Sequence, residues 1–184
     1  MSSLPMMSGA TSLRAFTRPA SAPDWARHWD CAYDEPIGDR PSDNGFVTLL
    51  AACRATGGIA RASDLAGMLA DRHRGDFSCL ARLIASGAAF GFEWHDMFWV
   101  PMFQFEPADL SVRLVQRRVL AELAPEFDGW LLATWFARRN AGLDDRRPLD
   151  MLDSDLAGVV RAARADGRAA RESAGRSALA PGVL

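Results

Sequence analysis

Arginine is the residue type that offers this chain most of its binding chemistry. All 21 basic side chains are Arg. Four of them recur near the C-terminus at intervals of three, four and three residues: Arg161, Arg164, Arg168 and Arg171. In a helix, this spacing places the four guanidinium groups on one face. Such a stripe is typical either of the solvated face of an Ala-rich helix or of a surface that binds an acidic partner or phosphate.

A second group of arginines brackets a loop around Asn140 and Gly142. Its members are Arg138, Arg139, Arg146 and Arg147. Helix C-termini favour cations through the helix dipole, so helix stability alone can explain the first two. The alternative interpretation is a contact site on the loop.

Residues suited to catalysis or metal binding are not grouped in the sequence. The histidines His28, His73 and His95 fall in an N-terminal segment, a helix end and a turn, without a neighbouring base or nucleophile. No His, Cys, Asp or Glu spacing matches a metal-ligand pattern, and Gly57-Gly58 indicates a helix stop rather than a phosphate loop. We therefore expect a binding protein and not an enzyme, with no catalytic residue, no metal and no cofactor.

The composition predicts a globular protein of the cytoplasm. The chain is 49% hydrophobic with a net charge of −2, so no global field draws it toward nucleic acid or anionic lipid. Cys31, Cys53 and Cys79 are odd in number and widely spaced, which argues against a disulfide framework. No apolar run has the length of a membrane span or a signal peptide, so we expect no membrane partner.

The elements that must position these residues begin after an N-terminal stretch, 1–44, that reads as a flexible arm because it is rich in Pro, Ser and Ala. Residues 45–105 predict three helices and a hairpin. The first helix ends at Gly57-Gly58, Ser63 caps the second, and Asp76 caps the third, which stops at Gly87. The second helix is expected to hold Leu65, Met68 and Leu69, and the residues expected to point inward from the third are Phe77, Leu80, Leu83 and Ile84.

Aromatic residues then alternate over 90–94, His95-Asp96 forms a turn, and 97–100 returns as a second strand. Three helices followed by a hairpin wing is the layout of a winged helix-turn-helix module. The candidate DNA-binding residues are Arg72, Arg74, Ser78 and Arg82. Five Arg and five acidic residues in 45–105 make this module neutral, so both an architectural role and a DNA-reading role stay open.

The second half, 106–167, is predicted to be helical. A helix can begin at Pro107, Asp128 caps another, and Pro148 starts a short turn of helix. Asp153 or Ser154 caps a last helix, which Gly167 weakens before an Arg/Ala-rich tail over 168–184.

Three segments of the chain resemble the toxin-binding domain of the Xre/MbcA/ParS antitoxin family, over roughly residues 100–166. They are Pro101-Met-Phe-Gln-Phe105, the Trp-containing helix from Trp130 to Trp135, and Arg147-Pro-Leu-Asp-Met-Leu152. The resemblance implies the antitoxin of a type II toxin–antitoxin system. Such a protein binds and neutralises a RES-like toxin that consumes NAD or modifies proteins with ADP-ribose, and it represses its own operon.

The resemblance also implies a motif loop formed by Arg147, Pro148, Leu149, Asp150 and Leu152. Leu149 and Leu152 are expected to be buried, and the neighbouring arginines are expected to make the contacts. The predicted toxin-binding residues are Arg138, Arg139, Arg146, Arg147, Pro148, Leu149, Asp150, Arg161, Arg164, Arg168 and Arg171. Expected partners are the toxin, operator DNA and a second copy of the chain. The alternative function is a stand-alone DNA-binding transcriptional regulator without a toxin partner.

Overall fold

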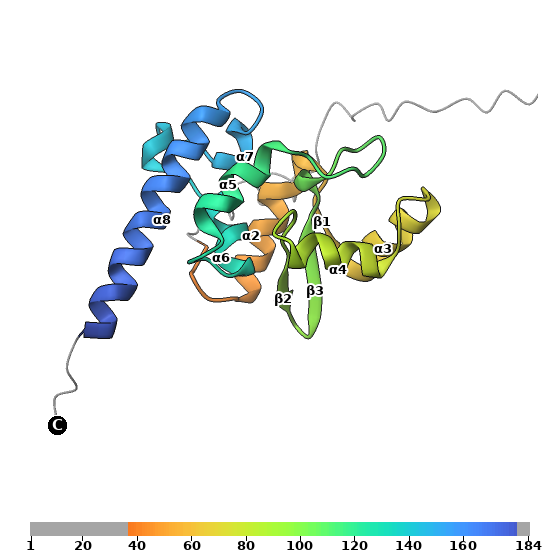
Figure 1. Ribbon diagram of the computed structural model, residues 1–184, viewed down its shortest axis with the longest axis horizontal. Coiled ribbons are helices and arrows are strands. Elements are labelled where there is room, and N and C mark those ends of the chain that lie inside the picture. Colours follow the sequence, from red (N-terminus) through yellow and green to blue (C-terminus); the bar gives the residue numbers. More distant parts are fainter. Residues whose placement is uncertain (1–36, 180–184) are drawn as a thin grey trace, which may run out of the picture. The chain divides into compact units, whose positions relative to one another are not determined.

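The computed structural model describes residues 37–179, and side-chain burial for residues 37–176. Most of the predicted arm, residues 1–36, and the end of the predicted tail, residues 180–184, lie outside this described part. The described chain is mainly helical and carries one small antiparallel sheet (Figure 1). This confirms the mainly α class that the sequence predicts.

Figure 1 labels the elements by which the binding surfaces can be located. The α-helices of the described part are α2 (Asp43–Cys53), α3 (Ala62–Asp71), α4 (Phe77–Ala85), α5 (Val115–Leu123), α6 (Gly129–Ala137), α7 (Pro148–Met151) and α8 (Leu156–Leu179). The strands are β1 (Ile59–Arg61), β2 (Phe92–Trp94) and β3 (Met97–Pro101), and the short 3-10 turns are η2 (Arg54–Thr56), η3 (Met102–Gln104) and η4 (Ala141–Leu143). None of the helices within residues 37–179 combines the length and hydrophobicity needed to cross a membrane.

The predicted hairpin is present as β2 and β3. His95 and Asp96 connect the strands with positive φ angles of 48° and 55°, which is the backbone of a two-residue type I′ turn. A third strand, β1, pairs antiparallel with β3, so that the strand order is β1-β3-β2. The sequence did not predict β1, because three residues directly after Gly57-Gly58 are too few to show an alternating pattern.

Two of the three N-caps predicted for α3, α4 and α6 are present in the structure. The Asp76 carboxylate accepts hydrogen bonds from the Ser78 and Cys79 amides at 2.9 and 3.2 Å, as predicted for the cap of α4. Asp128 likewise caps α6. The prediction that Ser63 caps α3 was wrong: β1 leads directly into a helix that begins at Ala62, and no side chain caps it.

The helix predicted to begin at Pro107 was wrong as well, because α5 begins only at Val115. Residues 106–114 form an irregular loop in which the Asp109 carboxylate accepts hydrogen bonds from the amide and hydroxyl of Ser111. Such local bonds compete with helical ones. Leu110 takes a positive φ of 57° there and is buried.

The last helix differs from the prediction at both ends. Asp155, not Asp153 or Ser154, caps α8 by accepting a hydrogen bond from the Gly158 amide at 2.9 Å. Gly167 does not end the helix, which continues through Leu179. A Cβ at Gly167 would lie 2.4 Å from the Glu122 carbonyl oxygen, so glycine here allows α8 to pack closely against α5.

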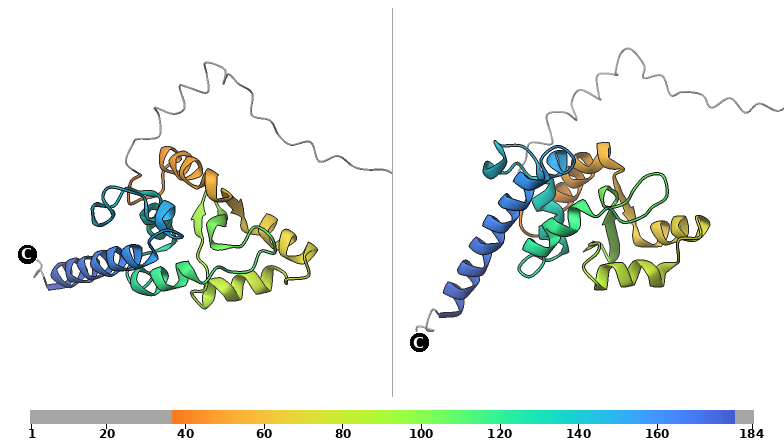
Figure 2. Two further views of the ribbon diagram at one scale, coloured as in Figure 1. Left: turned by 90° about the horizontal axis from the view of Figure 1, so that it is seen from above. Right: turned by 45° about the horizontal axis from the view of Figure 1, so that its top comes forward.

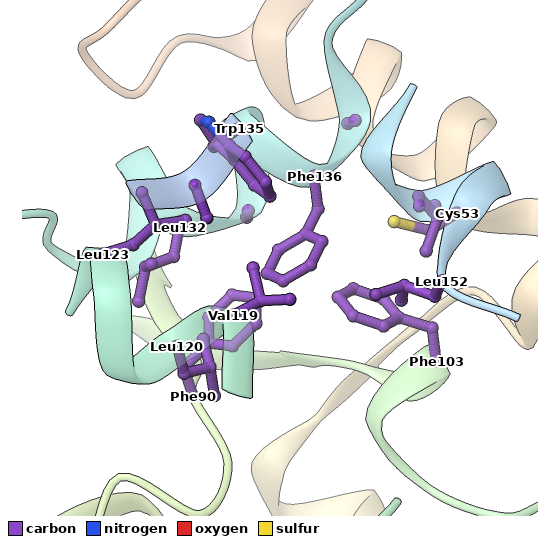
Figure 3. Close-up of a cluster of buried hydrophobic side chains, with 14 of the residues drawn as sticks. Cys53, Phe90, Phe103, Val119, Leu120, Leu123, Leu132, Trp135, Phe136 and Leu152 are labelled. Atoms are coloured by element: carbon purple, nitrogen blue, oxygen red, sulfur yellow. The ribbon is translucent and has the colours of Figure 1, made fainter. Parts of the chain in front are cut away.

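Two hydrophobic cores hold these elements together. The larger core contains α2 and the C-terminal helices, with Phe90, Phe103 and Phe136 stacked or tilted against one another (Figure 3). The smaller core lies under α3 and α4. In both views of Figure 2 the sheet lies between these two helices and α8.

The first of the three helices predicted for 45–105 therefore shares its core with the second half of the chain. Inside the smaller core, Leu80 is buried as predicted, together with Leu65 and Leu69, whereas Leu83 and Ile84 are partly buried. The prediction that Phe77 points inward was wrong, since it is 59% exposed, and Met68 on α3 is exposed as well. Phe77 is the first residue of α4, directly after the Asp76 cap.

Candidate binding surfaces

The Pro101–Phe105 motif lies where the two cores meet. Phe103 belongs to the larger core and Phe105 to the smaller one, while Gln104 between them is 0% exposed. The Gln104 side chain accepts a hydrogen bond from the Phe90 amide at 2.7 Å and donates to the carbonyls of Phe90 and Pro101 at 2.9 and 3.0 Å. The motif thus joins the two cores and supports the surfaces without forming them.

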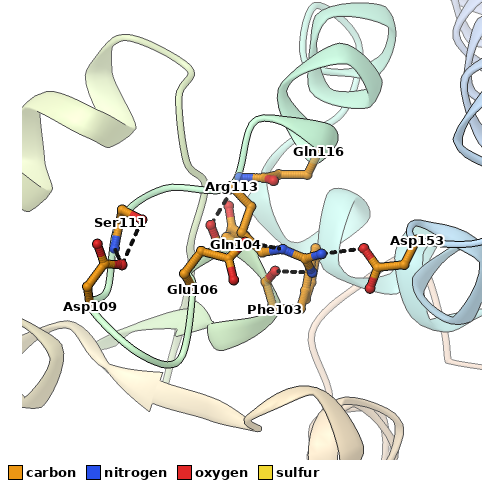
Figure 4. A network of polar contacts seen from close by, with 8 residues as sticks. All are labelled: Phe103, Gln104, Glu106, Asp109, Ser111, Arg113, Gln116 and Asp153. Carbon is orange, nitrogen blue, oxygen red and sulfur yellow. Dashed lines mark hydrogen bonds and ion pairs between the residues drawn. The ribbon is translucent and has the colours of Figure 1, made fainter.

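Arg113 connects the Pro101–Phe105 motif with Asp153, the residue directly after the Arg147–Leu152 motif (Figure 4). Its guanidinium donates to the Phe103 carbonyl at 3.4 Å and pairs with Glu106 at 3.1 Å and with Asp153. The side chain is only 20% exposed. Sequence reasoning missed it, because a single Arg next to an apolar stripe carries no signal for a partner so far along the chain.

The Arg147–Leu152 motif forms the start of α7. Pro148 occupies the first turn, and Leu149 and Leu152 are buried as predicted. The Arg147 guanidinium donates to the Asp150 carboxylate at 2.9 Å. Pro148 and Leu149 are therefore structural residues of the motif. The polar groups of Arg147 and Asp150 lie at its surface.

The structure gathers the predicted loop arginines around one backbone turn, closed by the Asn140 amide donating to the Arg146 carbonyl at 3.0 Å. Arg138 pairs with Asp39 at 3.1 Å, and Arg139 donates to the Asp145 carbonyl at 3.1 Å. Three carboxylates share the loop with the four arginines: Asp144, Asp145 and Asp150. The loop is therefore close to neutral, unlike the cationic site that the arginines alone suggest.

Asp166 fixes this loop to the helices beneath it. Its Oδ2 accepts hydrogen bonds from Trp135 Nε1 and from Asn140 Nδ2, both at 2.8 Å. These bonds join α6, the loop and α8 in one place. Asp166 is a second residue that sequence reasoning missed, since its role depends on contacts with residues more than 25 positions away.

Along α8, the four predicted arginines are all exposed. Arg164 donates through Nε and Nη2 to Glu122 Oε1 on α5, at 3.1 and 2.6 Å. The hydrogen bond from Arg164, together with the charges of Arg164, Arg171 and Arg168, lowers the pKa of Glu122. Glu122 therefore remains a carboxylate at the edge of the arginine stripe and holds its second member in place.

The residues predicted to bind DNA lie around the start of α4, but two of them are engaged within the chain. Arg74 pairs with Asp109, and Arg82 Nη2 lies 3.0 Å from Cys79 Sγ. Ser78 and Arg72 are exposed. The hydrogen bond from the Asp76 backbone and then the one from Arg82 lower the pKa of the Cys79 thiol.

The tip of the hairpin is acidic and packs against α2. Trp94 stacks on Phe46 with ring centroids 3.8 Å apart. Sequence reasoning found no partner for His95, yet its Nε2 lies 3.0 Å from Asp43 Oδ1, with both side chains largely exposed. A shallow hollow of about 300 Å³ opens here, lined by Pro41, Ser42, Asp43, Glu93, Trp94, His95 and Asp96.

Within residues 37–179, no three His, Cys, Asp or Glu side chains gather closely enough to hold a metal ion. No protein-family model, no curated protein and no solved structure matches the chain. Its function is therefore inferred from its residues and their geometry.

Proposed function

We propose that the chain is the antitoxin of a type II toxin–antitoxin system. It neutralises, by protein–protein binding, a RES-like toxin that consumes NAD or attaches ADP-ribose to proteins. The observation that carries this proposal is the link through Arg113, which contacts Phe103 in one motif and Asp153 directly after the other. Arg113 thus ties together two of the segments that resemble the antitoxin family.

The loop from Arg138 to Arg147 has the properties of a preorganised contact surface. Asn140 is held by its backbone bridge to Arg146 and by its side-chain hydrogen bond to Asp166. A surface that is ordered before binding loses less conformational entropy when a partner docks. Its exposed guanidinium groups can form paired hydrogen bonds with carboxylate or phosphate groups of the toxin.

Cationic groups placed at the NAD site of such a toxin would occupy the position that receives the pyrophosphate of the substrate. The arginine stripe on α8 adds, as a second cationic surface, charge that the loop lacks. We further propose that the complex acts in the cytoplasm and that the antitoxin forms a homodimer and represses its own operon.

A second candidate function is a stand-alone transcriptional regulator. The element order from α2 to β3, namely helix, strand, two helices and hairpin, favours it because this is the order of winged helix-turn-helix modules, in which α4 would enter the major groove. The contacts and charges of the polar side chains on this module are less favourable for DNA binding. Arg74 and Arg82 make contacts within the chain, and Glu93 and Asp96 would bring negative charge toward DNA phosphates.

Co-purification tests the first proposal. The tagged chain is co-expressed with the untagged product of the adjoining reading frame, and a stable complex is expected. Arg139→Glu combined with Arg146→Glu should weaken it, whereas Arg72→Glu, exposed at the end of α3 beside the smaller core, should not. Thermal melts of all variants show whether the fold is retained. No complex, or equal retention by both variants, contradicts the proposed surface.

A further inference from the structure

A second basic surface, which we call the α5–α8 basic face, is formed by Arg118 on α5 together with Arg161, Arg164, Arg168 and Arg171 on α8. Arg118 lies one helical turn before Glu122, on the edge of α5 whose Glu122 contacts Arg164. The two helices contain seven Arg and three acidic residues, a net charge of +4 in a chain whose net charge is −2. Positive charge is therefore concentrated on this pair of helices.

The three carboxylates, Glu122, Asp166 and Glu172, leave the two helices with a net positive charge. Asp166 accepts hydrogen bonds from Trp135 and Asn140 on the core side of α8. Glu122 forms an ion pair with Arg164, and the charges of Arg168 and Arg171 also act on it. Within the described residues, no carboxylate forms an ion pair with the other four: Arg118, Arg161, Arg168 and Arg171.

The face has few of the apolar anchors on which protein–protein interfaces depend. Among the exposed large hydrophobic residues of the described chain, only Leu114, the N-cap of α5, adjoins it, and none lies within α5 or α8. Protein interfaces typically bury aromatic and aliphatic side chains at their centre, whereas a phosphate backbone needs only cations and hydrogen-bond donors. Between its arginines α8 offers mainly Ala and Gly, which let a partner's backbone approach the helix closely.

The length of the arginine row on α8 also matches a regular row of phosphate groups. Arg161 and Arg171 are ten residues apart, which corresponds to about 15 Å along the helix. One strand of duplex DNA presents a phosphate about every 3.4 Å of its axis, so the row spans about four phosphates. All residues from 171 to 176 are exposed, and this end of α8 extends beyond the other helices in Figure 1.

We propose that the α5–α8 basic face binds the sugar-phosphate backbone of duplex DNA without sequence preference. The contact is independent of α4, whose Arg82 is engaged with Cys79. It goes beyond the proposed toxin binding, because DNA and a toxin would compete for Arg161, Arg168 and Arg171. A contact of this kind tethers the protein to DNA through charge alone, so that salt controls its affinity.

Fluorescence anisotropy of the full chain with two labelled duplexes of unrelated sequence tests the proposal. Both should bind alike, and four phosphate contacts should cost about 100-fold in affinity between about 50 and 200 mM salt. Arg161→Gln, Arg168→Gln and Arg171→Gln together should weaken binding at least about tenfold and lower the salt slope by about two to three. The matched control carries Arg72→Gln, Arg74→Gln and Arg82→Gln and should bind like the parent.

Three outcomes would overturn the proposal. The first is no binding at low salt, and the second is loss of binding in the control instead of the α8 variant. The third is displacement of DNA by polyglutamate as readily as by unlabelled duplex at equal charge, which would assign the face to an acidic protein. Co-purification of the same variants with the product of the adjoining reading frame is scored separately, so failure of DNA binding is distinguishable from failure of toxin binding.

Discussion

The side-chain amide of Gln104 pairs with the backbone of Phe90 at both ends, accepting from its N–H at 2.7 Å and donating to its carbonyl at 2.9 Å. The pairing resembles one rung of a β-ladder made by a side chain. It ties the Pro101–Phe105 motif to the segment that precedes β2, inside a core without solvent access.

We expect Gln104→Met to lower the free energy of unfolding by about 2–4 kcal/mol, because both backbone groups of Phe90 would be left buried without partners. Chemical denaturation measures the change. Gln116→Met is the matched control. Gln116 is equally buried, but among residues 37–179 its Oε1 has no partner, and only its Nε2 donates a hydrogen bond, to the Gln104 carbonyl at 3.1 Å. The control should change stability by less than about 1 kcal/mol. Equal losses in the two variants would refute this role for Gln104.

Two glycines of α8 should respond to alanine with opposite signs. At Gly167 a Cβ would meet the Glu122 carbonyl at 2.4 Å, so Gly167→Ala is expected to destabilise by about 1–3 kcal/mol despite the better helix propensity of Ala. A Cβ added at Gly175 would meet no atom of the described residues within 4 Å, and Gly175→Ala should stabilise by up to about 1 kcal/mol. Thermal unfolding distinguishes the two, and stabilisation by both would show that α8 does not pack on α5 as described.

The ion pair between Glu122 and Arg164 predicts a pH dependence of stability. Because the pKa of Glu122 is lowered below its ordinary 4.5 in the folded protein, its contribution is present above that value and is lost as pH falls through the folded pKa. Glu122→Gln should therefore lower the melting temperature at neutral pH. The difference from the parent should disappear well below pH 4.5, and a difference that is independent of pH would rule out the carboxylate as its cause.

The two described cysteines should differ in reactivity. The pKa of Cys79 is lowered by hydrogen bonds from the Asp76 backbone and Arg82, so its thiolate persists to lower pH than in a free thiol. Burial raises the pKa of Cys53 to about 12. In a Cys31→Ser background, iodoacetamide should alkylate Cys79 first, and Arg82→Gln should shift its rate profile to higher pH. Faster alkylation of Cys53 would contradict the packing around α2.

Local signals were sufficient for much of the fold. Asp76 and Asp128 could be identified as caps because a cap needs only its own helix. The His95-Asp96 turn could be placed because two β-favouring segments flank it. The predictions from Ser63 and Pro107 failed because Ser and Pro also begin turns and loops. Before α3 the chain pairs with β3 as β1, and after Pro107 it forms the Asp109 turn instead of a helix.

The candidate surfaces were only partly predictable. The arginine stripe of α8 follows from helical spacing, and all four of its members are exposed. Nothing in the sequence revealed that Glu122 would hold Arg164, or that Arg113 would reach Asp153, since both pairs join residues about 40 positions apart. Such contacts depend on the packing of α5 against the C-terminal helices, which no local pattern encodes.

Growth rescue tests the central proposal most directly. The product of the adjoining reading frame is expressed alone and together with this chain, and growth and cellular NAD are followed. We predict that the neighbour alone stops growth and depletes NAD or modifies proteins with ADP-ribose, and that the chain restores growth. A neighbour that is harmless alone, or toxicity that the chain does not relieve, would contradict the antitoxin proposal.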